Sequence, residues 1–126
     1  AICPPAYVGE HADVGNSAVA RGCEILGEVK NSVLSTGCHV GRGAEVSYSV
    51  VMPGAVIEDG ARVAYAIVGE GCRIGAKARV GAPPEEAADP DSWGIAVLGP
   101  HTEVAQRETV PPKAMLDRTH GKEDAQ

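Results

Sequence analysis

The sequence is organised by a six-residue repeat, in which aliphatic residues recur at every sixth position and a small residue follows four positions after each. Nine units meet both conditions, and they begin at Val8, Val19, Leu34, Val40, Val51, Ile57, Val68, Ile74 and Leu98. A further unit, Val104 to Val110, keeps the spacing but has Glu108 at the small position. Self-similarity of this kind indicates a solenoid, in which each repeat is stable only against its neighbours.

A longer period lies above the six-residue one. Leu34, Val51 and Val68 are spaced 17 residues apart, as expected if three short strands of six, six and five residues make one coil. The coil from Val19 to Leu34 has only 15 residues and is shortened at Gly27-Glu28-Val29. Four similar segments, NSAVARGC, NSVLSTGC, YSVVMPGA and YAIVGEGC, therefore mark the same corner of successive coils.

These periods predict an all-β fold, a single-stranded left-handed parallel β-helix with the shape of a triangular prism. The aliphatic residues point into the bore, and the small residues leave room for the chain to turn. Stacked coils pair as parallel strands about 4.8 Å apart, which predicts a prism about 25 Å tall. Gly41, Gly69 and Gly75 follow aliphatic residues and are expected to relieve backbone strain at corners. The left hand is taken from the known association of this hexapeptide pattern with left-handed coils, against the usual right-handed crossover.

The composition fits a narrow, repeating interior. Hydrophobic residues make up 44% of the chain but aromatic residues only 3%, with 16 glycines and no Phe. The formal net charge of −6 argues against a nucleic-acid-binding surface and against an anionic membrane surface. No apolar run is long enough to span a bilayer, and the sequence does not begin with a signal peptide. A reducing, cytoplasmic setting is expected, because the four cysteines form no CxxC pair.

Domain boundaries follow from where the repeat stops. We expect the β-helix to occupy residues 1–116, with an excursion loop at about 81–94 and a polar tail at 117–126. The loop contains three prolines and four acidic residues without a period. Pro111-Pro112 is expected to end the strand ladder, because proline cannot donate its hydrogen bonds. The chain begins at Ala1, in sequence that already reads as the middle of a domain, and we expect it to be part of a longer protein.

Three stretches together resemble the C-terminal domain of bacterial glucose-1-phosphate adenylyltransferases. They are PPAYVGEHADVGNSAVARGCEILGEVKNSVL, YSVVMPGAVIEDGARVAYAIVGEGCRIG and GIAVLGPHTEV, within residues 3–116. The shortened coil, GCEILGEVKNSVL, is the most specific part, since many families share a bare hexapeptide repeat.

The resemblance implies a role for this domain rather than a chemical step. The full enzymes make ADP-glucose and pyrophosphate from ATP and glucose 1-phosphate for glycogen or starch synthesis. Their N-terminal nucleotidyltransferase domain, where Mg²⁺ is expected, has no counterpart in this sequence. The resemblance implies a regulatory and oligomerisation domain that contacts its own catalytic domain and other subunits of a homotetramer. It also implies a response to a sugar-phosphate or nucleotide effector. This chain alone is predicted not to be an enzyme, with no catalytic, cofactor-binding or metal-ligating residues.

A stand-alone hexapeptide enzyme is the alternative, namely a trimeric acyltransferase that would use a histidine as a base. The histidines are His11, His39, His101 and His120. His39 is predicted to point outwards from a prism wall, and His101 lies in the turn GPHT. We expect both to be solvated surface residues. A zinc site, which needs three converging ligands, is not expected because these positions lie far apart in coil order.

The remaining chemically active residues receive structural interpretations. Cys23, Cys38 and Cys72 fall at the small inward position and are expected to fill the core as small apolar residues, while Cys3 lies near the terminus. Tyr48 and Tyr65 are expected to stack at one corner as an outer ladder or a subunit contact. Six basic residues are expected to be solvated on the walls, although some could contact a phosphate-bearing effector: Arg21, Arg42, Arg62, Arg73, Lys77 and Arg79.

Overall fold

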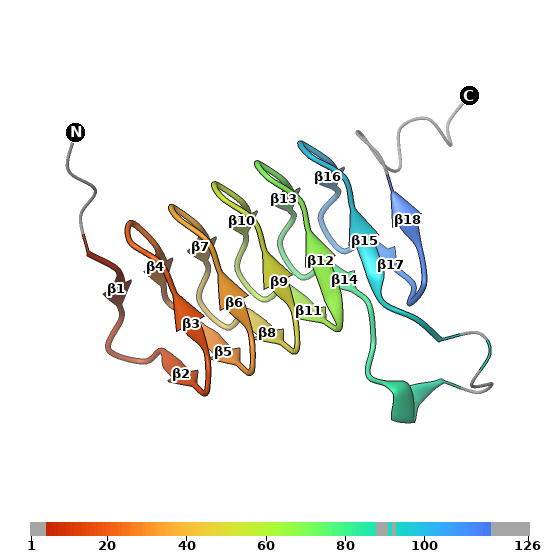
Figure 1. Ribbon diagram of the computed structural model, residues 1–126, viewed down its shortest axis with the longest axis horizontal. Coiled ribbons are helices and arrows are strands. Elements are labelled where there is room, and N and C mark those ends of the chain that lie inside the picture. Colours follow the sequence, from red (N-terminus) through yellow and green to blue (C-terminus); the bar gives the residue numbers. More distant parts are fainter. Residues whose placement is uncertain (1–4, 88–90, 92, 117–126) are drawn as a thin grey trace.

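The computed structural model describes residues 5–87, 91 and 93–116, which wind into a prism with three flat walls (Figure 1). Each wall is a parallel sheet of six strands, and successive strands of the chain belong to successive walls. Sheet A contains β1 (Tyr7–Val8), β4 (Glu24–Ile25), β7 (His39–Val40), β10 (Val56–Ile57), β13 (Arg73–Ile74) and β16 (Glu103–Val104). Sheet B contains β2 (Asp13–Gly15), β5 (Glu28–Lys30), β8 (Glu45–Ser47), β11 (Arg62–Ala64), β14 (Arg79–Val80) and β17 (Thr109–Val110). Sheet C contains β3 (Ala18–Val19), β6 (Val33–Leu34), β9 (Val50–Val51), β12 (Ala66–Val68), β15 (Ala96–Leu98) and β18 (Met115–Leu116).

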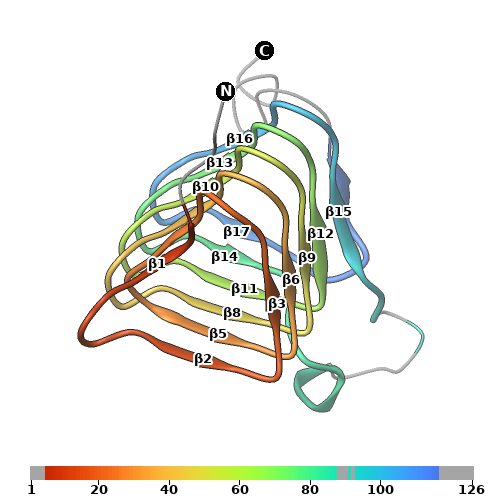
Figure 2. The ribbon, with the colours of Figure 1, turned by 60° about the vertical axis from the view of Figure 1, so that its left-hand side comes forward.

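The coils are left-handed, as predicted. Figure 2 views the prism with its N-terminal end forward. The chain runs from β1 down to the base, along β2 and up through β3, counterclockwise as the coils recede from the viewer. This hand is opposite to that of nearly all parallel crossovers.

The predicted inward residues form the core. Within each strand, one side chain points into the bore and its neighbour points out, because side chains alternate across a strand. The strand register aligns inward residues of successive coils: Val40 pairs with Ile57, and Ile57 pairs with Ile74. From Cys23 to Val110, the bore is filled by aliphatic, alanine and cysteine side chains that are almost completely buried. At the N-terminal end of the described residues, Val8 is 49% exposed.

The corner between sheets B and C contains a serine ladder that the sequence analysis did not predict. The Ser17 hydroxyl accepts a hydrogen bond from the Ser32 amide at 3.0 Å, and the Ser32 hydroxyl accepts one from the Ser49 amide at 3.1 Å. The Ser49 hydroxyl accepts one from the Ala66 amide at 3.2 Å. These side chains therefore satisfy backbone donors at a turn where the strand ladder is interrupted.

One prediction about the chain path is wrong. Pro111-Pro112 does not end the ladder, since β18 follows and pairs with β15 (Val97 with Met115, Leu98 with Leu116). The two prolines lie between β17 and β18, at a turn of the prism, where a ladder donor is not required. One more repeat unit therefore exists, with Ala114 at the small position and Leu116 at the aliphatic one.

Glycines 41, 69 and 75 are required for a different reason from the one predicted. None of the three has a positive φ. Instead, a Cβ on Gly41 would lie 2.7 Å from the Asp59 amide nitrogen, and one on Gly69 would lie 2.5 Å from the Leu98 carbonyl oxygen. These glycines therefore allow the backbones of adjacent coils to approach each other closely.

Candidate functional site

A hollow among the described residues lies where the 15-residue coil is shortened. The first and third coils bulge at the corner between sheets A and B, through residues 9–12 and 41–44. The second coil has no such bulge and turns at Leu26-Gly27. A notch of about 550 Å³ therefore lies between the bulges of the first and third coils. We call this hollow the corner notch. Its lining residues are Tyr7, Gly9, Glu10, His11, Leu26, Gly27, Glu28, Arg42, Gly43 and Ala44.

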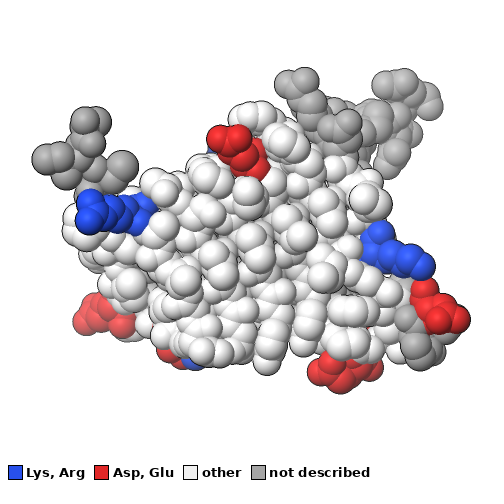
Figure 3. Space-filling model, in the orientation of Figure 1, with Lys and Arg blue, Asp and Glu red and all other residues white. Residues whose placement is uncertain are grey.

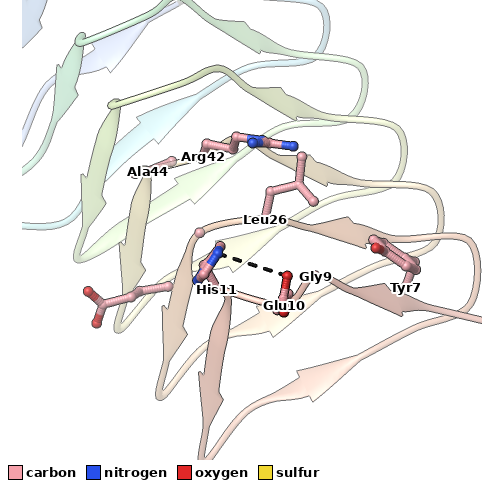
Figure 4. A pocket seen from close by; sticks show the side chains of 10 residues that line it. Tyr7, Gly9, Glu10, His11, Leu26, Arg42 and Ala44 are labelled. Carbon is pink, nitrogen blue, oxygen red and sulfur yellow. Dashed lines mark ion pairs between the residues drawn. The ribbon is translucent and has the colours of Figure 1, made fainter.

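Side chains of mixed character surround the corner notch (Figure 4). The half-buried Leu26 side chain forms its apolar centre, and the Arg42 side chain lies on one side of it. Glu10 and His11 lie on the other side, with 4.0 Å between the Glu10 carboxylate and His11 Nε2. Both of these side chains are highly exposed. The notch can receive a side chain or a small ligand, but it does not gather a nucleophile, a base and an oxyanion donor.

The histidines do not converge. His11, His39 and His101 belong to the first, third and fifth coils. His39 is on the outer wall of sheet A, as predicted, and its Nδ1 lies 2.9 Å from Glu24 Oε1. His101 occupies a corner with a φ of +59°. Within residues 5–87, 91 and 93–116, no three His, Cys, Asp or Glu side chains are grouped to hold a metal ion. His120 lies outside the described residues.

The basic residues considered as effector contacts are distributed over several walls and corners. Two of them form ion pairs with acidic neighbours: Arg73 with Glu58, and Arg62 with Glu45 at 3.7 Å. Arg62 and Arg79 line a second hollow, about 380 Å³, between sheet B and the start of the excursion loop. Since Glu45 and Glu86 line the same hollow, its charge is mixed rather than strongly positive. Arg21, Arg42 and Lys77 contribute to other corners of the prism.

The tyrosine ladder is confirmed. The Tyr48 and Tyr65 rings stack with centroids 4.8 Å apart and planes 11° apart. Trp93 meets the Tyr65 ring edge-on at 5.5 Å, and its indole nitrogen donates to the Ala82 carbonyl oxygen at 2.6 Å. Both tyrosines have φ near +50°, which is costly for a bulky residue. The ladder thus attaches the two ends of the excursion loop to the prism, and this part of the loop contains the short 3-10 helix η1 (Pro84–Glu86).

The cysteine prediction is also confirmed for the described thiols. Cys23, Cys38 and Cys72 are free and buried in the bore. Each thiol lies within hydrogen-bonding distance of a carbonyl oxygen of the next coil, at 3.0 Å for Cys23 to Ser35 and 3.1 Å for Cys38 to Met52. Burial, reinforced by the neighbouring Cys23, raises the pKa of Cys38 to about 11. Burial likewise raises the pKa of Cys72. Cys3 lies outside the described residues.

These thiols are expected to be inert in the folded protein. A raised pKa depletes the thiolate, which is the reactive form, and the bore excludes the reagent. At pH 8, a thiol-specific chromogenic reagent should modify no more than the Cys3 thiol in the native chain and all four thiols after unfolding. A Cys3→Ser variant isolates the three buried groups. Rapid native labelling of that variant would show that the bore opens easily.

Sequence reasoning overlooked the chemistry of the third wall. The outward residues of sheet C are all apolar: Ala18, Val33, Val50, Ile67, Val97 and Met115. The signal was present as six apolar doublets, each with one inward and one outward residue. The apolar row becomes visible only when the outward member of each doublet is compared from coil to coil.

The prism of stacked hexapeptide coils defines the class of the molecule, a hexapeptide-repeat β-solenoid domain. The chain belongs to the GlmU-like C-terminal hexapeptide family, whose model matches residues 4–99. Within the described residues, no helix has the length and apolar character needed to cross a bilayer.

Sequence relatives are more specific. The chain is 38% identical over 111 residues to a glucose-1-phosphate adenylyltransferase of Desulfitobacterium hafniense, a match that covers 83% of this chain and 26% of the relative. It is 58% identical over 43 residues to the enzyme of the same name from Clostridioides difficile, covering 34% of this chain and 11% of that relative. The chain thus spans about a quarter of the length of the Desulfitobacterium relative, and the resemblance seen in the sequence is confirmed.

A solved structure has a related shape. A hexapeptide transferase family protein from Anaplasma phagocytophilum matches with a TM-score of 0.48 and 20% identity, over 90% of this chain and 70% of that one. At this level of similarity it adds nothing to the functional argument.

Proposed function

We propose that this chain is the regulatory and oligomerisation domain of a glucose-1-phosphate adenylyltransferase. The observation that carries the proposal is the match to the Desulfitobacterium relative over 83% of the chain. The shortened coil, which produces the corner notch, lies within the matched family region as well. In this proposal, ATP, glucose 1-phosphate and Mg²⁺ bind to an N-terminal catalytic domain, and the β-helix holds such domains in a homotetramer that responds to a sugar-phosphate or nucleotide effector.

The exposure of the N-terminal end of the prism supports the proposal that a neighbouring domain covers it. Val8 is exposed, and the next bore residues, Val14 and Val19, are only partly buried. Among the described strands, β1 also has one edge without a partner, and folded proteins normally cover such edges. We propose that the catalytic domain covers this end near Tyr7. The expected contact at Ile2 lies outside the described residues.

A chimaera tests the proposal. The Desulfitobacterium enzyme, cut before the region that matches this chain, would be joined to residues 5–116. The chimaera is expected to assemble as the intact relative does and to form ADP-glucose faster than the truncated relative alone. A Val46→Asp chimaera, which places a charge in the bore, should lose both properties, while the outward Val56→Asp should retain them. A folded chimaera no more active than the truncated relative would contradict the proposal.

One observation favours the alternative, a stand-alone acyltransferase. The Glu24 carboxylate can hold the His39 ring in one orientation, as a base requires. Such an enzyme would be a stable trimer. It would also catalyse acetyl transfer from acetyl-coenzyme A, and the His39→Ala substitution would abolish this activity. Loss of transfer in that variant, with the trimer intact, would favour the acyltransferase over the adenylyltransferase domain.

A further inference from the structure

The three walls of the prism differ sharply in outward chemistry. On sheet A the outward positions include Glu24, His39 and Arg73, and on sheet B they include Glu45 and Arg62. Sheet C has no charged residue in its outward row, and Figure 3 shows a broad uncharged surface over these strands. We call this surface the apolar wall and define it as Ala18, Val33, Val50, Ile67, Val97 and Met115. Met52 and Ile95, also exposed, border it.

The apolar wall has its smallest outward side chain at one end of the prism and its longest at the other. Its first coil carries Ala18, and a shallow hollow of about 350 Å³ lies beside it, between β3 and β6. Its last described coil carries Met115, a long side chain that is 81% exposed. The middle rows, Val50 and Ile67, are intermediate in length. The wall therefore has a depression at one end and a protrusion at the other.

We propose that the apolar wall pairs face to face with the same wall of a second copy of this chain, with the two prism axes antiparallel. The two-fold axis would lie in the interface, parallel to the strands and between β9 and β12. This arrangement deepens, and rests on, the oligomerisation role proposed above. In an isologous contact, residue i meets j and j meets i. Met115 of each copy would then fill the hollow beside Ala18 of the other.

The same symmetry matches the other rows. Val33 would face Val97, and Val50 would face Ile67, so every facing pair combines a shorter side chain with one at least as long. Flat aliphatic sheets pack in this way at a separation of about 10 Å. A parallel arrangement would instead oppose Met115 to Met115 and Ala18 to Ala18, which leaves a protrusion against a protrusion and a gap against a gap.

Charges at the borders are compatible with the antiparallel pairing. Along the corner between sheets C and A, Glu70 of the fourth coil would lie opposite the third coil of the second copy, whose corner residue is Pro53. Along the other border, Tyr48 would lie opposite Tyr65. Neither place opposes two like charges, which would cost free energy.

The area of the apolar wall sets the expected strength. Six strands at about 4.8 Å and about five residues of width at about 3.3 Å give roughly 450 Å² per copy. The total of about 900 Å² is below the 1,200–2,000 Å² of stable complexes. The pairing is therefore expected to be reversible and dependent on concentration in the isolated chain, and to be reinforced where other contacts hold the copies together.

Sedimentation equilibrium tests the partner. The native chain should rise from one chain mass of 12.9 kDa towards two as the concentration approaches millimolar. Val50→Asp places a carboxylate at the centre of the apolar wall on both copies and should weaken pairing by at least about 100-fold, because the charge is buried without a partner. Val56→Asp, the same change on sheet A, is the matched control and should pair like the native chain. Circular dichroism would establish that both variants are folded.

Disulfide cross-linking tests the orientation in a Cys3→Ser background. A mixture of Ala18→Cys and Met115→Cys chains should form a mixed dimer on oxidation, whereas Ala18→Cys alone should not cross-link. Self-linking of Ala18→Cys would overturn the antiparallel arrangement. A native chain that stays monomeric at millimolar concentration, or a Val50→Asp chain that pairs normally, would overturn the second copy as partner. Those results would leave the chimaera test untouched, so failure of the pairing and failure of the proposed function can be told apart.

Discussion

Replacing Gly27 with alanine is expected to destabilise the domain strongly. Among the glycines of the first three coils whose φ is negative, we expect this change to have the largest effect. Gly27 is buried under the shortened coil, and a Cβ there would lie 2.3 Å from the Ala44 carbonyl oxygen and 2.6 Å from that of Gly41. The Ala44 oxygen also accepts the Glu28 amide at 2.9 Å, so the backbone cannot move away without losing a hydrogen bond. We expect a loss of about 3 kcal/mol or more in the free energy of unfolding, measured by urea denaturation.

Gly54→Ala is the matched control. Gly54 has a φ of +73°, but a Cβ at this position would meet no atom within 4 Å. Only the left-handed backbone is penalised, at about 1 kcal/mol. Equal losses for the two variants would mean that the close approach of coils at the corner notch does not limit the fold.

The second large effect is expected in the bore. Ile57 is fully buried between Val40 and Ile74, and Ile57→Ala should cost about 4 kcal/mol through lost burial and the cavity left behind. Val56, its neighbour in β10, points outwards, and Val56→Ala should cost less than about 1 kcal/mol. Denaturation midpoints of the two variants measure the difference.

This pair of variants tests the direction of the side chains rather than hydrophobicity in general. A one-residue shift of register would exchange the two faces of β10. If Val56→Ala were the more damaging change, the inward set from Val8 to Val110 would be wrong.

Most of the fold follows from the repeat because one physical requirement recurs in every coil. Val40, Ile57 and Ile74 must each fill the same small volume, so the sequence repeats the same side-chain size at the same spacing. The last unit was not predicted, because Pro111-Pro112 has no amide donors and was expected to end the strand ladder. The following Ala114 and Leu116 nevertheless continue the repeat. Where a proline falls at a corner, the ladder can resume beyond it.

Features that depend on adjacent coils were harder to predict. The 15-residue coil was visible as a deletion, but its consequence, a notch between two protruding corners, requires the neighbouring coils at Glu10 and Arg42. The need for glycine at position 41 likewise comes from Asp59, 18 residues later. The apolar wall arises from residues that are each unremarkable alone, and it emerges only when Val33, Val50 and Ile67 are stacked.

The structure separates three roles within one prism. The bore provides stability, the corner between sheets A and B carries the corner notch, and sheet C offers a surface without charge in its outward row. A rigid solenoid with such surfaces suits a domain that positions other domains, since each wall can be occupied independently. The proposed regulatory and oligomerisation role rests on this division together with the match to the adenylyltransferases.

The most direct test of this account is the molar mass of the chain in solution, measured by light scattering after gel filtration over a range of concentrations. The account predicts one chain at low concentration and an approach to two chains at high concentration, relative to 12.9 kDa per chain. A stable mass of three chains would contradict it, because trimers are expected of stand-alone hexapeptide acyltransferases, and His39 and His101 would then become the residues to test.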